Sequence, residues 1–169
     1  MTRAMGIDLA HGRTGLVLLP AQWAADGRLD WSVVGHLLID GADVARSHPV
    51  DRRAEIVRRV LAAADAWDAD VLAVEESFSA RNSAAALLAK LHGELERRCH
   101  ADGRELVRVT RAAAYRLAVG RGNAPKEALQ AMLQSAGAPF WQQQDVCDAW
   151  AIANYALSDR GFRCVGVAA

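Results

Sequence analysis

The spacing of apolar residues divides the chain into an opening of short strands and a longer region where helices and strands alternate. Met5–Asp8, Leu16–Leu19 and Leu29–Ile39 are predicted strands, and Gly12 and Gly15 mark a turn between the first two. Turn-forming residues also precede the third strand. We therefore expect the chain to begin as an antiparallel meander.

The remaining pattern predicts helices packed around further strands. Apolar residues from Ile56 to Ala64 have helical spacing, and Val71–Val74 is a short apolar strand of the kind that helices cover on both faces. A further strand is predicted over 105–109, and helices over 82–99, 111–119, 126–134 and from Gln144 onward. The expected fold is a single α/β domain over residues 1–169, with a five-stranded mixed sheet (first three strands antiparallel) flanked by helices.

The composition excludes several classes of protein. At 169 residues the chain suits one domain, and no apolar run is long enough to span a bilayer. The N-terminus has no signal-peptide pattern, so a cytoplasmic protein without membrane association is expected. The three cysteines are widely spaced and form no C-x-x-C pair, which favours reduced thiols over a disulfide framework or a zinc site.

The net charge is zero, but the charges are unevenly distributed. Residues 26–76 contain 11 acids and 6 arginines, whereas residues 78–126 contain 10 basic residues and 4 acids. A basic surface beside an acidic centre is typical of proteins that hold a polyanion near a metal. The alternative is that arginine simply serves as the solubilising residue, since 18 of the 20 basic residues are arginine.

Four carboxylates form the candidate chemistry. Asp145 and Asp148 are three apart at the start of the last helix, where they share one face; alone, the pair is equally an acidic first turn that complements the helix dipole. Asp8 and Glu75 each end a predicted strand, and sites in open α/β sheets assemble at that edge. If the four converge, with no basic partner evident to neutralise them, they favour Mg²⁺ or Mn²⁺ and hydrolysis of a phosphodiester by activated water.

Four segments resemble, in order and spacing, the motifs of one family. The chain is similar to the RuvC-type Holliday-junction resolvases, crossover junction endodeoxyribonucleases of the RNase H-like superfamily. The matching segments are Gly6–Asp8 with Thr14–Gly15, Val74–Phe78 with Ala80–Asn82 and Ala86–Leu87, Gly120–Lys126, and Asp145–Ala153.

The resemblance assigns roles to individual residues. It implies that Lys126 is a catalytic basic residue near the scissile phosphate and that Phe78 stacks on unpaired bases at the junction centre. The implied catalytic metal ligands are Asp8, Glu75, Asp145 and Asp148. Beside Phe78, the expected DNA contacts are Arg81, Asn82, Arg116 and Arg121.

The resemblance also implies an activity and partners. The expected enzyme is a homodimer that resolves four-way DNA junctions by paired symmetric nicks in homologous recombination and repair. Mg²⁺ is the implied cofactor, with Mn²⁺ also supporting activity, and the products carry a 5′-phosphate and a 3′-hydroxyl. Branch-migration proteins are further candidate partners.

Three features depart from the family pattern. Leu9-Ala10 replaces the usual Pro-Gly after the first aspartate, and Tyr115 stands where many members have a second active-site lysine. Tyrosine cannot supply that fixed charge, which Arg116 could provide instead. Together with the zero net charge, these departures leave the range of substrates open.

Several alternatives follow from the residues alone. Glu76 competes with Glu75 as a ligand, although strand alternation points only one of them into the site. The chain could instead be a nuclease or a non-catalytic binding protein for other branched or structured nucleic acids. An actin-like ATPase or sugar-kinase fold also begins with G-I-D and a nearby T-G, but it needs two such domains around a cleft.

Overall fold

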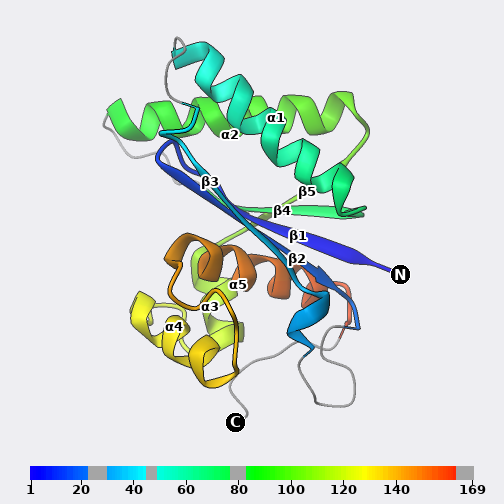
Figure 1. The fold of residues 1–169 in the computed structure, drawn as a ribbon, viewed down its shortest axis with the longest axis vertical. Coiled ribbons are helices and arrows are strands. Elements are labelled where there is room, and N and C mark those ends of the chain that lie inside the picture. Colours follow the sequence, from blue (N-terminus) through cyan, green and yellow to red (C-terminus); the bar gives the residue numbers. More distant parts are fainter. Residues whose placement is uncertain (23–29, 45–48, 77–82, 163–169) are drawn as a thin grey trace.

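The computed structural model describes residues 1–22, 30–44, 49–76 and 83–162. Within them, five strands and five α-helices follow one another along the chain (Figure 1). The strands are β1 (Arg3–Asp8), β2 (Arg13–Pro20), β3 (Gly35–Asp40), β4 (Val71–Glu75) and β5 (Glu105–Val109). The α-helices are α1 (Pro49–Ala66), α2 (Ser83–Ala101), α3 (Arg111–Val119), α4 (Lys126–Ser135) and α5 (Gln144–Asp159).

The five strands form one mixed sheet in the order β3-β2-β1-β4-β5. Strand β2 pairs antiparallel with both β1 and β3, whereas β4 runs parallel to β1 and β5. This arrangement confirms the prediction of a five-stranded mixed sheet whose first three strands are antiparallel. It also makes β1 and β4 adjacent parallel strands, so their carboxyl ends lie at the same edge of the sheet.

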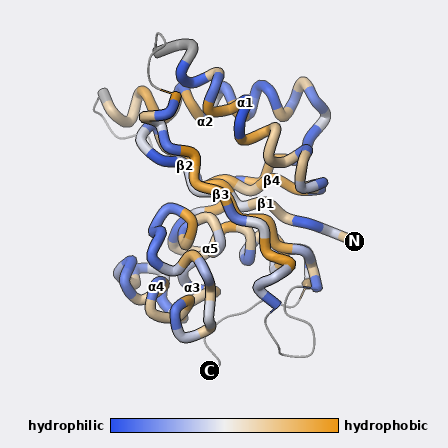
Figure 2. Tube along the Cα trace, viewed as in Figure 1, coloured by the Kyte–Doolittle hydropathy of each residue, from blue (hydrophilic) through white to orange (hydrophobic). Residues whose placement is uncertain are grey.

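Helices cover both faces of the sheet, α1 and α2 on one side and α3, α4 and α5 on the other (Figure 1). The central strands are the most apolar part of the trace, between two layers of helices with mixed surfaces (Figure 2). Residue alternation divides the core accordingly: Ala4 packs with the α5 side, while Met5 and Ile7 pack with the α1 and α2 side. All three are 0% exposed, and the charged residues of β1 stand only at its two ends, Arg3 and Asp8, because the strand is buried on both faces.

The third strand is shorter than the sequence predicts. Instead of a strand over Leu29–Ile39, the described part of that range has a 3₁₀ turn at Trp31–Val33 before β3 begins at Gly35. The side chain of Asp30 accepts a hydrogen bond from the Ser32 amide and caps this turn. The Trp31 indole donates to the carbonyl of Ala136 at 2.6 Å, a long-range contact that the apolar pattern of the segment could not reveal.

Local signals account for the ends of α3 and the start of α4. Thr110 caps α3 by accepting from the Ala113 amide, and Gly120 ends it with φ of 79°, a conformation that favours glycine. Pro125 stands at the N-cap of α4, immediately before its first residue Lys126. No helix in the described ranges is both long enough and apolar enough to cross a bilayer.

Candidate active site

Two of the four predicted carboxylates leave the sheet side by side. Ile7 of β1 pairs with Val74 of β4 in parallel register, and the next residue of each strand is Asp8 and Glu75, respectively. Adjacent parallel strands therefore place these two carboxylates at one edge. This is the placement that the strand-end argument predicted from the sequence.

Helix α5 brings the other two carboxylates to the same edge by lying directly on β1 and β2. A Cβ atom at Gly6 would lie 1.9 Å from the carbonyl oxygen of Ala149, and one at Gly15 would lie 2.0 Å from that of Asp145. Only glycine lets the helix backbone approach so closely. The two glycines thus set the depth at which Asp145 and Asp148 reach the site.

The four carboxylates interact electrostatically. Burial, followed by the charges of Asp148, Glu75 and Asp145, raises the pKa of Asp8 to about 8. Burial and the charge of Asp148 also raise the pKa of Glu75. Side chains more than 60 residues apart in sequence therefore lie close enough to disfavour one another's ionised forms.

Basic side chains partly neutralise this cluster, contrary to the expectation that it has no basic partner. Lys126 donates from Nζ to Oδ2 of Asp148 at 3.0 Å, and its charge opposes the rise in the pKa of Asp8. Arg13 pairs with Asp145 at 3.1 Å from the start of β2. The contact of Lys126 required α4 to lie beside α5, and nothing local in the sequence specifies that packing.

Asp148 is the most enclosed of the four carboxylates, at 5% exposure. Its Oδ1 accepts hydrogen bonds from Tyr115 Oη at 2.6 Å and from Gln144 Nε2 at 2.9 Å. Gln144 and Asp148 are four residues apart in one helix, a spacing that places side chains next to each other, so the Gln144 contact could be predicted from the sequence. The Tyr115 contact joins α3 to α5, and no local pattern predicts it.

Arg111, and not its helix neighbour Arg116, is the arginine that lies over Tyr115. The Arg116 side chain is exposed, whereas the Arg111 guanidinium lies over the Tyr115 ring, 4.5 Å from its centroid. The pKa of Glu75 is raised overall by burial and by the charge of Asp148, and the charge of Arg111 partly opposes that rise. Sequence position alone favoured Arg116 because it is the immediate neighbour of Tyr115.

Glu75 and Glu76 separate as strand alternation predicts. Glu75 interacts with Asp148, Arg111 and Lys126 at the carboxylate cluster. Glu76 lines a different cavity, of about 180 Å³, beside His92, Glu96 and Arg108. Of the two acids, Glu75 is therefore the one placed to act with the other three carboxylates.

The donor chemistry of the cluster fits a hard divalent cation, since all four side chains offer carboxylate oxygens. Burial, and after it the repulsion between the carboxylates, raises the pKa of Asp8, and a bound cation would relieve that repulsion. In the described part of the chain, no three His, Cys, Asp or Glu side chains are already gathered as a metal site. Two of the carboxylates are instead paired with Lys126 and Arg13.

The remaining predicted DNA contacts are Arg121, which the structure describes, and three residues that it does not. Arg121 is exposed in the turn before α4, so its side chain is accessible to a ligand. Phe78, Arg81 and Asn82 lie outside the described residues.

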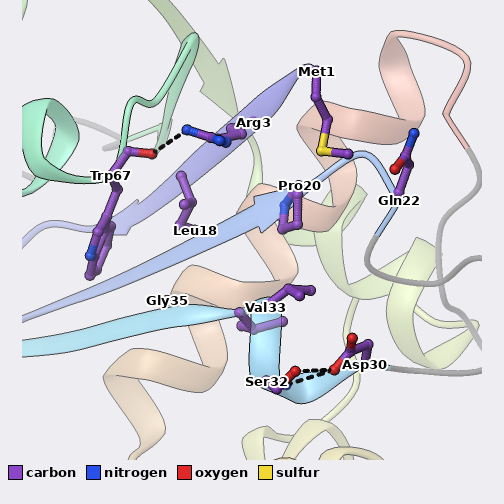
Figure 3. A pocket seen from close by; sticks show the side chains of 11 residues that line it. Met1, Arg3, Leu18, Pro20, Gln22, Asp30, Ser32, Val33, Gly35 and Trp67 are labelled. Carbon is purple, nitrogen blue, oxygen red and sulfur yellow. Dashed lines mark hydrogen bonds between the residues drawn. The ribbon is translucent and has the colours of Figure 1, made fainter.

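A larger cavity, of about 610 Å³, lies away from this chemistry. It is lined by Arg3, Leu18, Gly35 and Trp67, among others, at the start of β1, the end of β2 and the start of β3 (Figure 3). Asp8 is at the other end of β1. The candidate active site is therefore the carboxylate edge of the sheet and not this cavity.

The mixed five-stranded sheet with helices on both faces defines an RNase H-like fold. The family model described as "Crossover junction endodeoxyribonuclease RuvC" matches residues 4–155. The chain therefore belongs to the RuvC family of crossover junction endodeoxyribonucleases. This membership confirms the resemblance and the class of enzyme predicted from the four motifs.

Solved structures have the same fold. A Thermus thermophilus RuvC structure aligns with a TM-score of 0.73 at 22% identity, over 95% of this chain and 96% of the other. T. thermophilus RuvC in complex with a Holliday junction substrate aligns with 0.72 at 20% identity, over the same shares of the two chains. The yeast mitochondrial Holliday junction resolvase Ydc2 aligns with 0.63 at 13% identity, over 92% of this chain and 79% of the other. At these identities the structures establish the fold alone, and no curated protein sequence matches.

Proposed function

We propose that this chain resolves four-way DNA junctions by paired symmetric nicks, in recombination and repair. The observation that carries the proposal is the meeting of four carboxylates from β1, β4 and α5 at one edge of the sheet, in a chain of the RuvC family. A carboxylate cluster with a nearby ammonium suits the hydrolysis of a phosphodiester, whose reaction develops negative charge on oxygen.

RuvC-type nucleases depend on divalent metal ions, and we propose Mg²⁺ as the natural cofactor, with Mn²⁺ as a substitute. Asp8, Glu75, Asp145 and Asp148 would hold the metal. When bound, the metal would activate water for attack on the phosphate and stabilise the leaving oxygen.

The chain's own residues prepare this site. Lys126 holds Oδ2 of Asp148 and, at about half exposure, can also meet a phosphate oxygen. Arg13 is 59% exposed, so its guanidinium can leave its ion pair with Asp145 and bind a phosphate oxygen instead.

The proposed DNA contacts extend beyond these two basic residues. Arg116 and Arg121 have exposed side chains on α3 and in the turn that follows it, and suit backbone phosphates. We further propose base stacking by Phe78 and polar contacts from Arg81 and Asn82, where each stacked base contributes roughly 1–3 kcal/mol. The enzyme acts in the cytoplasm, and branch-migration proteins are candidate partners.

The decisive variant is Asp148→Asn. It removes a proposed metal ligand but keeps the shape of the side chain and leaves the exposed arginines untouched. We expect junction binding in a gel-shift assay within about threefold of wild type, and a loss of cleavage of at least roughly 100-fold. Cleavage near the wild-type rate would refute the assignment.

The substrate is tested by comparing nucleic acids of different shape. Purified protein with Mg²⁺ or Mn²⁺ is incubated with a four-way junction, a flap, an RNA–DNA hybrid and plain duplex, and products are resolved on gels. Preferential cutting of the junction is the expected result. If the flap or the hybrid is cut equally well or better, the alternative is favoured, in which the chain is a nuclease for other structured nucleic acids. The zero net charge and the presence of Tyr115 leave that alternative open.

A further inference from the structure

We propose that Tyr115 is a positioning residue for this reaction: its phenol fixes one oxygen of Asp148, so that the other oxygen is presented to a bound cation. The inference rests on the proposed function, in which Asp148 is a metal ligand. It concerns a residue that departs from the family's pattern, and it gives that departure a physical role.

The two oxygens of Asp148 have different partners. Oδ1 accepts from two neutral donors, Tyr115 Oη at 2.6 Å and Gln144 Nε2 at 2.9 Å. Oδ2 accepts only from the Lys126 ammonium among the described residues, at 3.0 Å. A divalent cation can take the place of an ammonium beside a carboxylate because both bring positive charge. Oδ2 is therefore the oxygen available for exchange, and Oδ1 is the one that stays held.

Tyr115 is itself firmly held, as a positioning residue must be. Its side chain is 1% exposed and packs in the core cluster that contains α5. The Arg111 guanidinium, one helical turn earlier, lies over its ring at 4.5 Å from the centroid. The phenol therefore has little freedom to follow Asp148 if that carboxylate turns.

The phenol of Tyr115 is a neutral hydrogen-bond donor to Asp148. A phenol directs the carboxylate without adding a second positive charge, which would compete with an incoming cation. A hydroxyl suits this position because it orients Asp148 and, being neutral, does not repel a bound metal ion.

The test is Tyr115→Phe, which deletes the hydroxyl and keeps the ring. Tyr155→Phe is the matched control, because Tyr155 is the second tyrosine of the chain and is half-buried on α5. Mn²⁺ binding to each protein without DNA is measured from the EPR signal of free Mn²⁺. We expect Tyr115→Phe to bind Mn²⁺ about tenfold more weakly than wild type, as for other residues that orient a metal ligand. Tyr155→Phe should bind like wild type.

A second variant tests whether the effect acts through Oδ1. Gln144→Ala removes the other donor to that oxygen, so each single variant leaves one donor in place. The double variant leaves none. We expect it to lose more Mn²⁺ affinity than the product of the two single losses, because the donors share one acceptor.

Each outcome decides the proposal. If folded Tyr115→Phe binds Mn²⁺ as tightly as wild type, the proposal is overturned. It is also overturned if the variant is less thermally stable in EDTA but has lost no Mn²⁺ affinity, because Tyr115 would then have only a structural role. If wild type binds no Mn²⁺, the positioning role is also overturned, because no ligand exchange remains to be directed. If wild type binds Mn²⁺ but does not cut a four-way junction, the proposed function fails, while the comparison of the two tyrosine variants still decides the role of Tyr115.

Discussion

At the scale of single residues, we expect the candidate active site to lower the free energy of unfolding of the metal-free protein. Asp8 ends a strand whose neighbours are buried, and three other carboxylates act on it. Its pKa of about 8 means that folding without a cation takes up a proton at neutral pH. The resulting decrease in the free energy of unfolding is the expected consequence of burying a carboxyl group among like charges that a metal would otherwise neutralise.

The raised pKa of Asp8 sets the direction of a pH dependence. Because its folded pKa lies above the ordinary value of 3.8, its effect on stability is absent below about pH 4 and grows until about pH 8. In EDTA, the free energy of unfolding should therefore fall as the pH rises through that window. Asp8→Asn should remove this slope and stabilise the metal-free protein by roughly 2–4 kcal/mol at pH 7, measured by urea unfolding.

Two controls separate this effect from general changes in charge. Asp43→Asn replaces an exposed carboxylate and should leave the slope of wild type unchanged. Adding Mg²⁺ should stabilise wild type more than Asp8→Asn, because a cation bound only by the folded state adds to its stability. A wild-type stability that rises between pH 5 and 8 in EDTA would contradict the proposed origin of the Asp8 shift.

At the scale of elements, the site depends on how closely α5 lies on the antiparallel half of the sheet. Gly6 and Gly15 contact the backbone of α5 with no space for a side chain. Asp145 and Asp148 are on the first turns of that helix, so any outward shift of α5 moves both away from Asp8 and Glu75. The glycines near the first aspartate are therefore required for helix packing as much as for a turn.

Gly15→Ala tests this packing. The added methyl group would meet the carbonyl of Asp145 at 2.0 Å, and a backbone atom cannot rotate away as a side chain can. We expect a destabilisation of roughly 3 kcal/mol or more in chemical denaturation, with a matching loss of cleavage. The control is Gly93→Ala on α2, where nothing lies within 4 Å of the new Cβ and helix propensity predicts a gain of up to about 1 kcal/mol. Equal stabilities of the two variants would show that α5 can shift at little cost.

At the scale of the whole molecule, the described part of one chain has one carboxylate cluster, whereas resolving a junction needs two cuts. We propose that the chain acts as a homodimer, which would meet this requirement by placing one such site on each of the two strands. A net charge of zero then makes local basic residues, and not overall attraction, the source of DNA affinity. Symmetric cutting should thus require two competent subunits in one complex.

Mixed dimers test this requirement. When wild-type subunits are assembled with an excess of Asp148→Asn subunits, most active dimers contain one competent site. On a supercoiled plasmid with an extruded cruciform, paired nicks give linear DNA and a single nick gives an open circle. We expect the product to shift from linear to open circle as the variant is added. An unchanged proportion of linear product would mean that one subunit makes both cuts, and sedimentation velocity should show the dimer directly.

The sequence by itself determined the elements and the identity of the carboxylates. Periodicity placed β5 and α3 at the bounds found in the structure, and the start of α5 at Gln144, because those segments have strong local patterns. The extent of β3 was wrong, because the cap at Asp30 and the long-range bond of Trp31 replace strand with a 3₁₀ turn.

The partners of the carboxylates were decided only by the tertiary structure. Tyr115 reaches Asp148 because α3 packs on α5, and Arg111 lies nearer the cluster than the neighbouring Arg116 because the helix turns its side chains to different faces. Arg13 and Lys126 likewise reach Asp145 and Asp148 from other elements. Local spacing determines which face a side chain occupies, but only the packing of distant elements determines what that face meets.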